Sequence, residues 1–362
     1  MSIGMSIKRI YIAWKTNNNK MLLLKIVRRI FGIHFNYALS IISPHNQVLF
    51  NKHFVSRVLL HESEEFLDQF FDFENIVREI PRWYSEEYLV ELADILVDTT
   101  SGIVFVNNQD PIAILESSNI LAIEVSDFLR PRTPKKVEEG KWAVLSSRSF
   151  AHWLLQDAPR FLRLFEQNPN LLIAISSDAP AYVEEMLLIC GITPDLRVPV
   201  LRAANFNFVS AQYAVGTSSL RDIQTLRTFQ DTLVNNYWNE QNLVNSHIAK
   251  KIFISRRFSN RALPNEEDLE EKARSAGFDV VYLERISLPE QIMMFEKAEV
   301  ICGTHGAGLA NLVWVRNCRS IFEIYNDTFQ NQTFRVLAQR LDIPYSRVHY
   351  LDALDAHAIW RN

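Results

Sequence analysis

Short apolar runs alternate with longer segments of helical periodicity from about residue 140 onward, and this alternation restricts the chain to few folds. The first set comprises strands at 142–145, 171–175, 197–201 and 207–211 and helices at 150–167 and 181–190. The second set comprises strands at 251–255, 279–283, 299–302 and 320–324 and helices at 266–276, 288–297, 309–315 and 332–341. Alternation of this kind favours parallel sheets covered by helices. The sequence therefore predicts two doubly wound α/β units.

A polar stretch at 239–251 separates the two sets and is typical of a linker between domains. The chain has 362 residues, more than the roughly 250–300 residues that one hydrophobic core usually serves. We therefore predict an accessory region at 1–100, a Rossmann-like domain at 101–245 and a second Rossmann-like domain at 246–362. In such folds, ligands bind beyond the carboxyl ends of the strands, where helix N-termini converge.

The charge of the chain is unevenly distributed. The net charge of −4 and the pI near 6.2 argue against a nucleic-acid-binding protein, which usually carries an excess of positive charge. Residues 1–61 nevertheless contain nine Lys and Arg and no Asp or Glu. Within this basic arm, residues 21–31 could form an amphipathic helix on an anionic membrane surface, or an ordinary helix packed on the body. The apolar run is far shorter than the ~20 residues that span a bilayer.

The three cysteines, Cys190, Cys302 and Cys318, show no spacing typical of a metal site. Two of them lie in apolar segments, which favours buried, reduced thiols. Reduced thiols are typical of the cytoplasm, so we expect a cytoplasmic protein, with peripheral contact at the inner face of the membrane if the basic arm docks there.

The strongest local feature is a glycine-rich turn between a buried strand and a helix, Gly303-Thr304-His305-Gly306-Ala307-Gly308. Glycines allow close approach to the backbone, and the amide groups at a helix start favour a phosphate group. The spacing is not that of the dinucleotide motif G-x-G-x-x-G, so a plain tight turn is the alternative.

Basic residues follow the neighbouring predicted strand. Arg256 and Arg261 lie just after residues 251–255, and Arg side chains pair bidentately with phosphate oxygens. Glu323, in the next strand, could accept hydrogen bonds from ribose hydroxyls, as acidic residues do in dinucleotide folds, or be an ordinary carboxylate at the sheet edge. Ser287 and Glu290 form a predicted capping box, and Gln291 beside them could face a nucleotide.

In the first unit, His152 lies in the first turn of a predicted helix and Asp157 follows five residues later. Either side chain could act as a general base in a cleft, or have only a structural role. The chain contains no Asp-x-Asp, the carboxylate pair that commonly carries a metal-bound nucleotide. We therefore expect no metal, with charge stabilised by arginine, histidine and backbone amides.

Taken in order, these motifs resemble glycosyltransferase family 61, in particular its bacterial capsular-polysaccharide type. The motifs that carry the resemblance are Ile254-Ser255-Arg256-Arg257 with Arg261, Asn265 and Gly277; Leu288-Pro289-Glu290-Gln291; Gly303 through Asn311; Phe322-Glu323-Ile324; and, more weakly, His152-Trp153-Leu154-Leu155 with Asp157 and Pro159. The resemblance covers roughly residues 140–345. Alanine at 310 and threonine at 304 replace residues common in the family.

The resemblance implies a GT-B fold, in which two Rossmann-like domains face each other across a cleft, with the acceptor bound at 101–245 and the nucleotide sugar at 246–362. It implies an inverting, metal-independent transferase that moves a sugar from a nucleotide-sugar donor, expected to be UDP-linked, to a glycan or other hydroxyl acceptor in polysaccharide biosynthesis. No further cofactor is implied. The expected donor-binding residues are Arg256, Arg261, Gln291, Thr304, His305, Gly306, Ala307, Gly308, Asn311 and Glu323.

Two alternatives stay open at this point. One is a non-catalytic protein that binds a nucleotide sugar or scaffolds a polysaccharide assembly complex. The other is a nucleotide-sugar epimerase or hydrolase that uses the same cleft.

Overall fold

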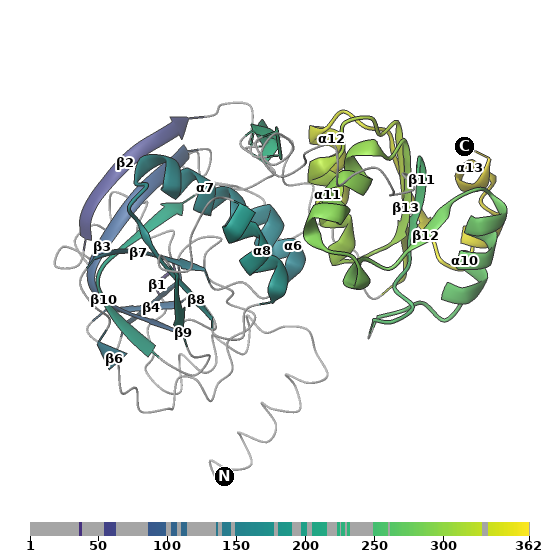
Figure 1. Ribbon diagram of the computed structural model, residues 1–362. Coiled ribbons are helices and arrows are strands. Elements are labelled where there is room, and N and C mark those ends of the chain that lie inside the picture. Colours follow the sequence, from purple (N-terminus) through teal and green to yellow (C-terminus); the bar gives the residue numbers. More distant parts are fainter. Residues whose placement is uncertain are drawn as a thin grey trace, which may run out of the picture.

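The computed structural model describes seventeen stretches of the chain (Figure 1). They are residues 36–37, 54–62, 86–98, 103–106, 110–113, 135–136, 140–145, 149–176, 180–189, 197–200, 205–215, 223–224, 226–228, 230–231, 249–259, 261–327 and 332–361. Residues 1–31 of the basic arm, most of the predicted linker and Cys190 lie outside these residues. In the part of the chain that the structure describes, no helix is both long and apolar enough to cross a membrane.

The N-terminal half is built on one ten-stranded sheet with the order β1-β5-β4-β3-β10-β7-β8-β9, in which β2 also pairs with β3 and β6 with β10. The strands are β1 (Asn36–Tyr37), β2 (Phe54–Glu62), β3 (Glu86–Asp98), β4 (Ile103–Val106), β5 (Asp110–Ala113), β6 (Lys135–Lys136), β7 (Lys141–Leu145), β8 (Leu172–Ser176), β9 (Arg197–Val200) and β10 (Asn205–Val215). Strands from before and after residue 100 thus share a sheet.

This sheet is mixed, which differs from the doubly wound parallel sheet expected for this half. Strands β10, β7, β8 and β9 are parallel neighbours, as the alternation from residue 140 onward predicts. Beyond β10, however, the sheet continues through the antiparallel pairs of β3 with β10, β2 and β4. The pair of β3 with β10 joins strands that lie far apart along the chain, such as Asp98 with Asn205, and a local sequence pattern carries no signal for such a pairing.

The predicted helix at 150–167 is present but is interrupted by a π-helical turn. It consists of α6 (Phe150–His152), the π-helical η4 (Trp153–Asp157) and α7 (Ala158–Gln167). The π turn adds a residue to the helix and re-aims the side chains that it carries, and such turns are frequent at functional sites. The next helix, α8 (Ala181–Ile189), connects β8 to β9, so α6 to α8 supply the βα crossovers of the parallel strands.

The C-terminal half contains a five-stranded parallel sheet with the order β12-β11-β13-β14-β15. Its strands are β11 (Lys251–Ile254), β12 (Asp279–Val281), β13 (Val300–Thr304), β14 (Ser320–Tyr325) and β15 (Tyr345–His349). The second through fourth residues of β11 and all five of β13 are buried, as expected for central strands with helices on both faces. This doubly wound sheet confirms the parallel sheet predicted for the second unit.

Helices cover both faces of this sheet (Figure 1). The elements are α10 (Glu266–Ser275), η7 (Leu283–Arg285), α11 (Leu288–Lys297), the 3₁₀ helix η8 (Ala307–Trp314), α12 (Thr333–Arg340), η9 (Ala353–Asp355) and α13 (His357–Trp360). Side chains of α10 and α13 pack with Phe253 and Phe322 on one face. Helices α11 and α12 lie on the other face, toward the N-terminal half.

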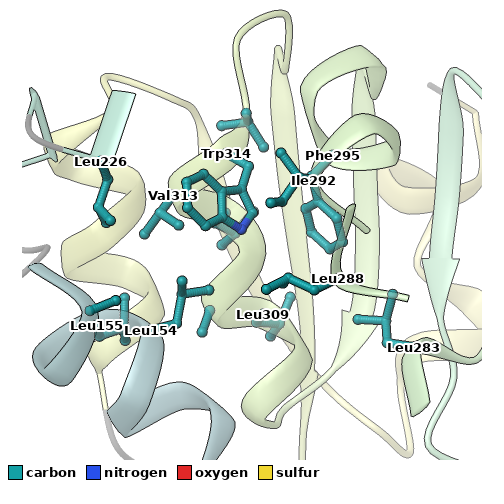
Figure 2. Close-up of a cluster of buried hydrophobic side chains, with 14 of the residues drawn as sticks. Leu154, Leu155, Leu226, Leu283, Leu288, Ile292, Phe295, Leu309, Val313 and Trp314 are labelled. Atoms are coloured by element: carbon teal, nitrogen blue, oxygen red, sulfur yellow. The ribbon is translucent and has the colours of Figure 1, made fainter. Parts of the chain in front are cut away.

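One apolar core joins the two halves (Figure 2). Leu154 and Leu155 from η4 belong to the same buried cluster as Leu309, Val313 and Trp314 from η8. Helix α8 also contacts α11, where the Glu185 carboxylate accepts a hydrogen bond from the Leu288 amide at 3.0 Å. Apolar side chains from η4 and η8 therefore connect the two halves in one core.

The cysteines within the described residues are free thiols. Cys302 is fully buried and Cys318 is half-buried. Burial raises the pKa of the Cys318 thiol to about 11 and that of Cys302 still further, so neither thiol is ionised near neutral pH. The burial of Cys302 agrees with the buried, reduced thiol that the sequence predicts.

Candidate functional site at the carboxyl edge of the second sheet

The connectivity of the second sheet indicates where a ligand binds. The chain passes from β11 out to the edge strand β12 and then returns to β13, so β11 and β13 are neighbours at the point where the direction of winding reverses. In open α/β sheets, the crevice beyond the carboxyl ends of these two strands is the usual ligand site. The arginine-rich loop at 255–261 follows β11, and the glycine-rich turn begins with the last two residues of β13. The predicted meeting of these two loops is confirmed.

The side chain of Arg256 lies directly on the backbone of Gly306. A Cβ atom at position 306 would overlap the guanidinium, with only 2.6 Å to its Cζ atom. Nη1 of Arg256 donates to the carbonyl oxygen of His305 at 2.6 Å, and Nε donates to Oγ of Ser259 at 3.2 Å. The missing side chain of Gly306 therefore makes the room in which the guanidinium lies.

The guanidinium of Arg256 is held close to a second positive charge. Its pKa is lowered by burial and by the charge of Arg261, while the acidic side chains of Glu266 and Glu284 act in the opposite direction. An arginine stays protonated in spite of such a shift. Two guanidinium groups whose charges repel each other at the ligand edge of a sheet favour an anion, whose binding removes the repulsion.

The other two glycines of the turn serve internal packing. A Cβ at Gly303 would lie 2.9 Å from Cβ of Ile254, and one at Gly308 would lie 2.7 Å from Cδ1 of Leu283. The turn therefore sits against β11 and η7 with no space for side chains. Ala307 and Gly308 begin η8, which is a 3₁₀ helix where an α-helix was expected. The first amides of a helix have no partner within it, as the predicted phosphate contact requires.

A buried carboxylate fixes the orientation of His305. Oε1 of Glu323 lies 2.7 Å from Nδ1 of His305 and 3.2 Å from Nε of Arg347, and the Tyr345 hydroxyl donates to Oε2. The Glu323 side chain has no exposed surface. Burial and the nearby Glu323 carboxylate raise the pKa of Tyr345 well above its ordinary value, so its hydroxyl stays a donor. The structure thus surrounds Glu323 with protein groups, and its expected ribose contact stays a prediction.

The carboxylate of Glu266, in the first turn of α10, accepts hydrogen bonds from both loops. One carboxylate oxygen accepts from the Arg256 amide at 2.8 Å and from the Thr304 hydroxyl at 2.9 Å. The other accepts from the Leu263 amide at 3.0 Å. Only 3% of Glu266 is exposed, and buried carboxylates need such partners. Within the turn, the Thr304 hydroxyl is therefore committed to Glu266.

Gln291 and Asn311 bond to each other inside the protein. The Asn311 amide donates to Oε1 of Gln291 at 2.9 Å, and Nε2 of Gln291 donates to the carbonyl oxygens of Leu283 and Ile286 at 3.0 and 2.9 Å. Both residues are buried. These contacts tie α11 to η8 and fix the turn before it. The structure does not bring these two side chains together with Arg256 and His305.

The two candidate bases of the first unit differ in exposure. His152 is exposed, and its Nδ1 lies 2.9 Å from Oε1 of Gln156. Asp157 is 1% exposed and is paired with the buried guanidinium of Arg160. The charge of Asp157, added to burial, raises the pKa of Tyr182 to about 12. Helix α6, which carries His152, packs against η8, the helix that begins in the glycine-rich turn.

Three residues of this site were not predicted from the sequence. Tyr345 and Arg347 lie on β15, a short strand after Pro344 that carries mostly polar residues and therefore has a weak strand signal. Glu266 is an acidic residue in the first turn of a helix, where acidic residues are common because they interact favourably with the helix dipole. The sequence alone therefore does not distinguish its role from that one. In the residues that the structure describes, no group of three or more His, Cys, Asp or Glu side chains could hold a metal ion.

Comparison with known proteins agrees with the family indicated by these motifs. The profile of the family described as Glycosyltransferase 61 matches residues 125–322. The EGF domain-specific O-linked N-acetylglucosamine transferase of Drosophila melanogaster is 34% identical over 77 residues, which are 20% of this chain and 15% of that protein. The Beta-1,2-xylosyltransferase of Arabidopsis thaliana is 34% identical over 67 residues, which are 18% of this chain and 12% of that protein.

The fold and the site define an α/β protein in which an arginine-bearing loop meets a glycine-rich turn at the carboxyl ends of two parallel strands. The family profile covers more than half of the chain, and the chain belongs to the glycosyltransferase 61 family. The two curated relatives are matched over only 15% and 12% of their own length, so the similarity to them is confined to a short segment.

Proposed function

We propose that this protein is an inverting glycosyltransferase that moves a sugar from a nucleotide-sugar diphosphate, UDP-linked, to a glycan or other hydroxyl acceptor without a metal ion. The observation that carries the proposal is the guanidinium of Arg256, which lies on the glycine turn next to Arg261. In this proposal the two halves act as the two domains of a GT-B arrangement. The donor occupies the edge beyond β11 and β13, and the acceptor approaches from the N-terminal half.

In the proposed reaction, the acceptor hydroxyl attacks the anomeric carbon from the face opposite the diphosphate. The bond from the anomeric carbon to the phosphate oxygen breaks, and its electron pair stays on the diphosphate. Arg256, Arg261, His305 and the amides at the start of η8 stabilise the charge that develops there. Stabilisation of developing charge by fixed donors is usually the largest catalytic effect in an enzyme.

His152 is assigned as the general base that removes the proton of the acceptor hydroxyl. Gln156 accepts a hydrogen bond through Oε1, so Nδ1 of a neutral His152 carries the proton and Nε2 has the free lone pair. Asp157 was the other predicted base, but it is buried and paired with Arg160. A base must reach the proton that it removes, so Asp157 is assigned to the support of its own helix.

The test measures transfer and slow donor hydrolysis with a panel of nucleotide sugars. Arg256→Ala is expected to lower the rate by about 10²–10³-fold, the usual cost of one such donor. The control is Arg319→Ala, since Arg319 is exposed and pairs with Glu299 on the opposite edge of the sheet. Unchanged turnover in Arg256→Ala would contradict the proposal. Nucleotide-sugar binding without turnover by the wild type would favour the non-catalytic scaffold, and an isomerised donor would favour an epimerase.

A role in capsule, exopolysaccharide or lipopolysaccharide synthesis at the cytoplasmic face of a bacterial membrane is part of this proposal. It is supported by the nine Lys and Arg among residues 1–61. If the arm docks through its charge, flotation with anionic liposomes should decrease with added salt and after deletion of residues 1–31. Flotation that is insensitive to both changes would assign the arm a structural role.

A further inference from the structure

Phe258 exposes an aromatic ring at the ligand edge of the second sheet. It is 52% exposed and, in the stretches that the structure describes, only Leu351 is a comparably exposed large hydrophobic residue. A single exposed apolar residue needs no explanation by itself. The place of Phe258 is the informative feature, because it follows Arg256 by two residues in the loop after β11, beside the winding reversal of the sheet.

The ring of Phe258 is fixed by its neighbours. The guanidinium carbon of Arg285 lies 3.9 Å from the ring centroid, and the ring of Tyr282 meets it edge to face with centroids 5.0 Å apart. A cation within about 6 Å of a ring centroid is attracted to the ring face, and edge-to-face packing is a preferred arrangement of two aromatic rings. More than half of the Phe258 surface nevertheless stays open.

The loop that carries this ring is also fixed. The Ser259 amide donates to the carbonyl oxygen of Arg256 at 2.8 Å. The Ser259 hydroxyl oxygen accepts from Nε of Arg256 and from the Arg261 amide, both at 3.2 Å. The same serine therefore holds both the cation that contacts the glycine turn and the backbone that presents Phe258. A ligand would find the charge and the ring in one preset arrangement.

Two arginines bring hydrogen-bond donors to the ring: Arg285 lies over one face of it, and Arg257, which pairs with Glu267, lies farther from the centroid. The guanidinium carbon of Arg257 lies 5.9 Å from the Phe258 centroid, and Arg285 is exposed. A flat ring with donors nearby matches a nucleobase, which has two flat faces and carbonyl or ring-nitrogen acceptors on its rim. Stacking of a base on an aromatic side chain tolerates any base, because each base has a π face.

We propose that Phe258, supported by Arg285 and Tyr282, is the stacking surface for the nucleobase of the donor. This inference rests on the proposed function, since it places the base of the same molecule whose diphosphate is assigned to Arg256. The three parts of the donor then follow one another along the edge: the base at Phe258, the diphosphate at Arg256 and the glycine turn, and the sugar toward α6.

The experiment measures the affinity of the full chain for uridine, guanosine, cytidine and adenosine diphosphates and for inorganic pyrophosphate. The wild type is expected to bind at least one nucleoside diphosphate more tightly than pyrophosphate. Phe258→Leu keeps the apolar volume and removes the ring face, and it should weaken the nucleoside diphosphate about tenfold or more, the usual effect of one lost stack. It should leave pyrophosphate binding unchanged, and Phe258→Tyr should behave as the wild type.

Two comparisons separate the possible failures. Arg256→Ala should weaken the nucleoside diphosphate and pyrophosphate alike, and Leu351→Ala, an exposed control, should change neither. If Arg256→Ala behaves in this way while Phe258→Leu binds the nucleoside diphosphate as the wild type does, the stacking surface is wrong and the donor site stands. If the wild type binds no diphosphate, the donor site and the stacking surface both fail.

Discussion

Nδ1 of His305 lies 2.7 Å from Oε1 of Glu323, a carboxylate with no exposed surface. Glu323 is in register with Gly303, the first glycine of the turn, so the acid sits one strand away from the turn that carries the histidine. In the proposed reaction, His305 contacts the leaving group and Glu323 determines where the imidazole points. The carboxylate is thus a positioning residue, which acts on the reaction only through His305.

The first prediction concerns this pair. Glu323→Gln should lower kcat by about 10²-fold, the cost of misplacing a reacting group by about 1 Å. The KM for the donor should change little, because the loss concerns the transition state. Steady-state kinetics measure this split. Tyr345→Phe keeps the His305 contact and should have a much smaller effect. An equal rise in KM, with kcat unchanged, would contradict the positioning role.

The second prediction tests the contact of Arg256 with Gly306. Gly306→Ala should displace the guanidinium and lower the transfer rate by about 10²–10³-fold, as Arg256→Ala does. In a chain that already carries Arg256→Ala, Gly306→Ala should lower the transfer rate little further, because the guanidinium that the new Cβ atom would overlap is absent. A double-mutant cycle measures this coupling, and simple additivity of the two losses would contradict it.

Gly277→Ala is the matched control for that cycle. Gly277 has a φ of +79°, and a Cβ atom added there would have no neighbouring atom within 4 Å. Alanine at this position should cost about 1–2 kcal/mol of stability through backbone strain alone, and the transfer rate should stay near that of the wild type. Comparison of the two glycines separates a general loss of stability from the local loss of the Arg256 contact.

The third prediction concerns Glu266. Glu266→Ala removes the acceptor of the Arg256 and Leu263 amides and of the Thr304 hydroxyl, so it should lower the free energy of unfolding by about 2–3 kcal/mol or more. Urea denaturation measures the change. Glu267→Ala, at the exposed neighbouring position, should stay within about 0.5 kcal/mol of the wild type. Equal stability of the two variants would show that the three hydrogen bonds are not essential.

The fourth prediction is a pH dependence of stability. Burial alone would raise the pKa of Glu270, but hydrogen bonds from Ser255, Tyr282 and Arg274 outweigh it and lower the pKa. A carboxyl with a lowered pKa in the folded state contributes stability in full above its unfolded pKa of about 4.3, and loses it as the pH falls through the folded value. The free energy of unfolding should therefore differ less between pH 7 and a pH below 4 in Glu270→Gln than in the wild type.

The fifth prediction tests the core shared by the two halves. Leu154→Ala should cost about 2–5 kcal/mol, because it leaves a cavity in the buried cluster that also holds Val313 and Trp314. The loss should appear in a single unfolding transition that includes both halves, measured by far-UV circular dichroism and by tryptophan fluorescence. Leu351→Ala, at an exposed position, provides the control. Two separate transitions in the wild type would mean that the halves unfold independently.

The sequence predicted the second sheet better than the first. A buried apolar run such as 300–304 can be recognised as a strand from the local sequence, because helical segments flank it. The predicted capping box of Ser287 and Glu290 is present. Strand β15 is half-buried and follows a proline, so its signal was weaker. The pairing of β3 with β10 depends on contacts between distant residues, which no local pattern encodes.

The site was predicted in outline and not in its contacts. The meeting of Arg256 with the glycine turn follows from the parallel sheet alone. The burial of Gln291 against Asn311 does not, since two amide side chains twenty positions apart look equally available for a ligand until the packing of α11 on η8 is known. Likewise, the exposure of His152 and the burial of Asp157 depend on the π-helical turn, which sequence periodicity does not reveal.

The overlap between a Cβ at position 306 and the Arg256 guanidinium also has an evolutionary consequence. In any related chain with this backbone, a side chain at position 306 and an arginine placed as Arg256 is here exclude each other. The two positions, fifty residues apart in the sequence, should therefore change together or not at all among homologues. A lineage that replaces the glycine must have found another way to hold the charge of its substrate.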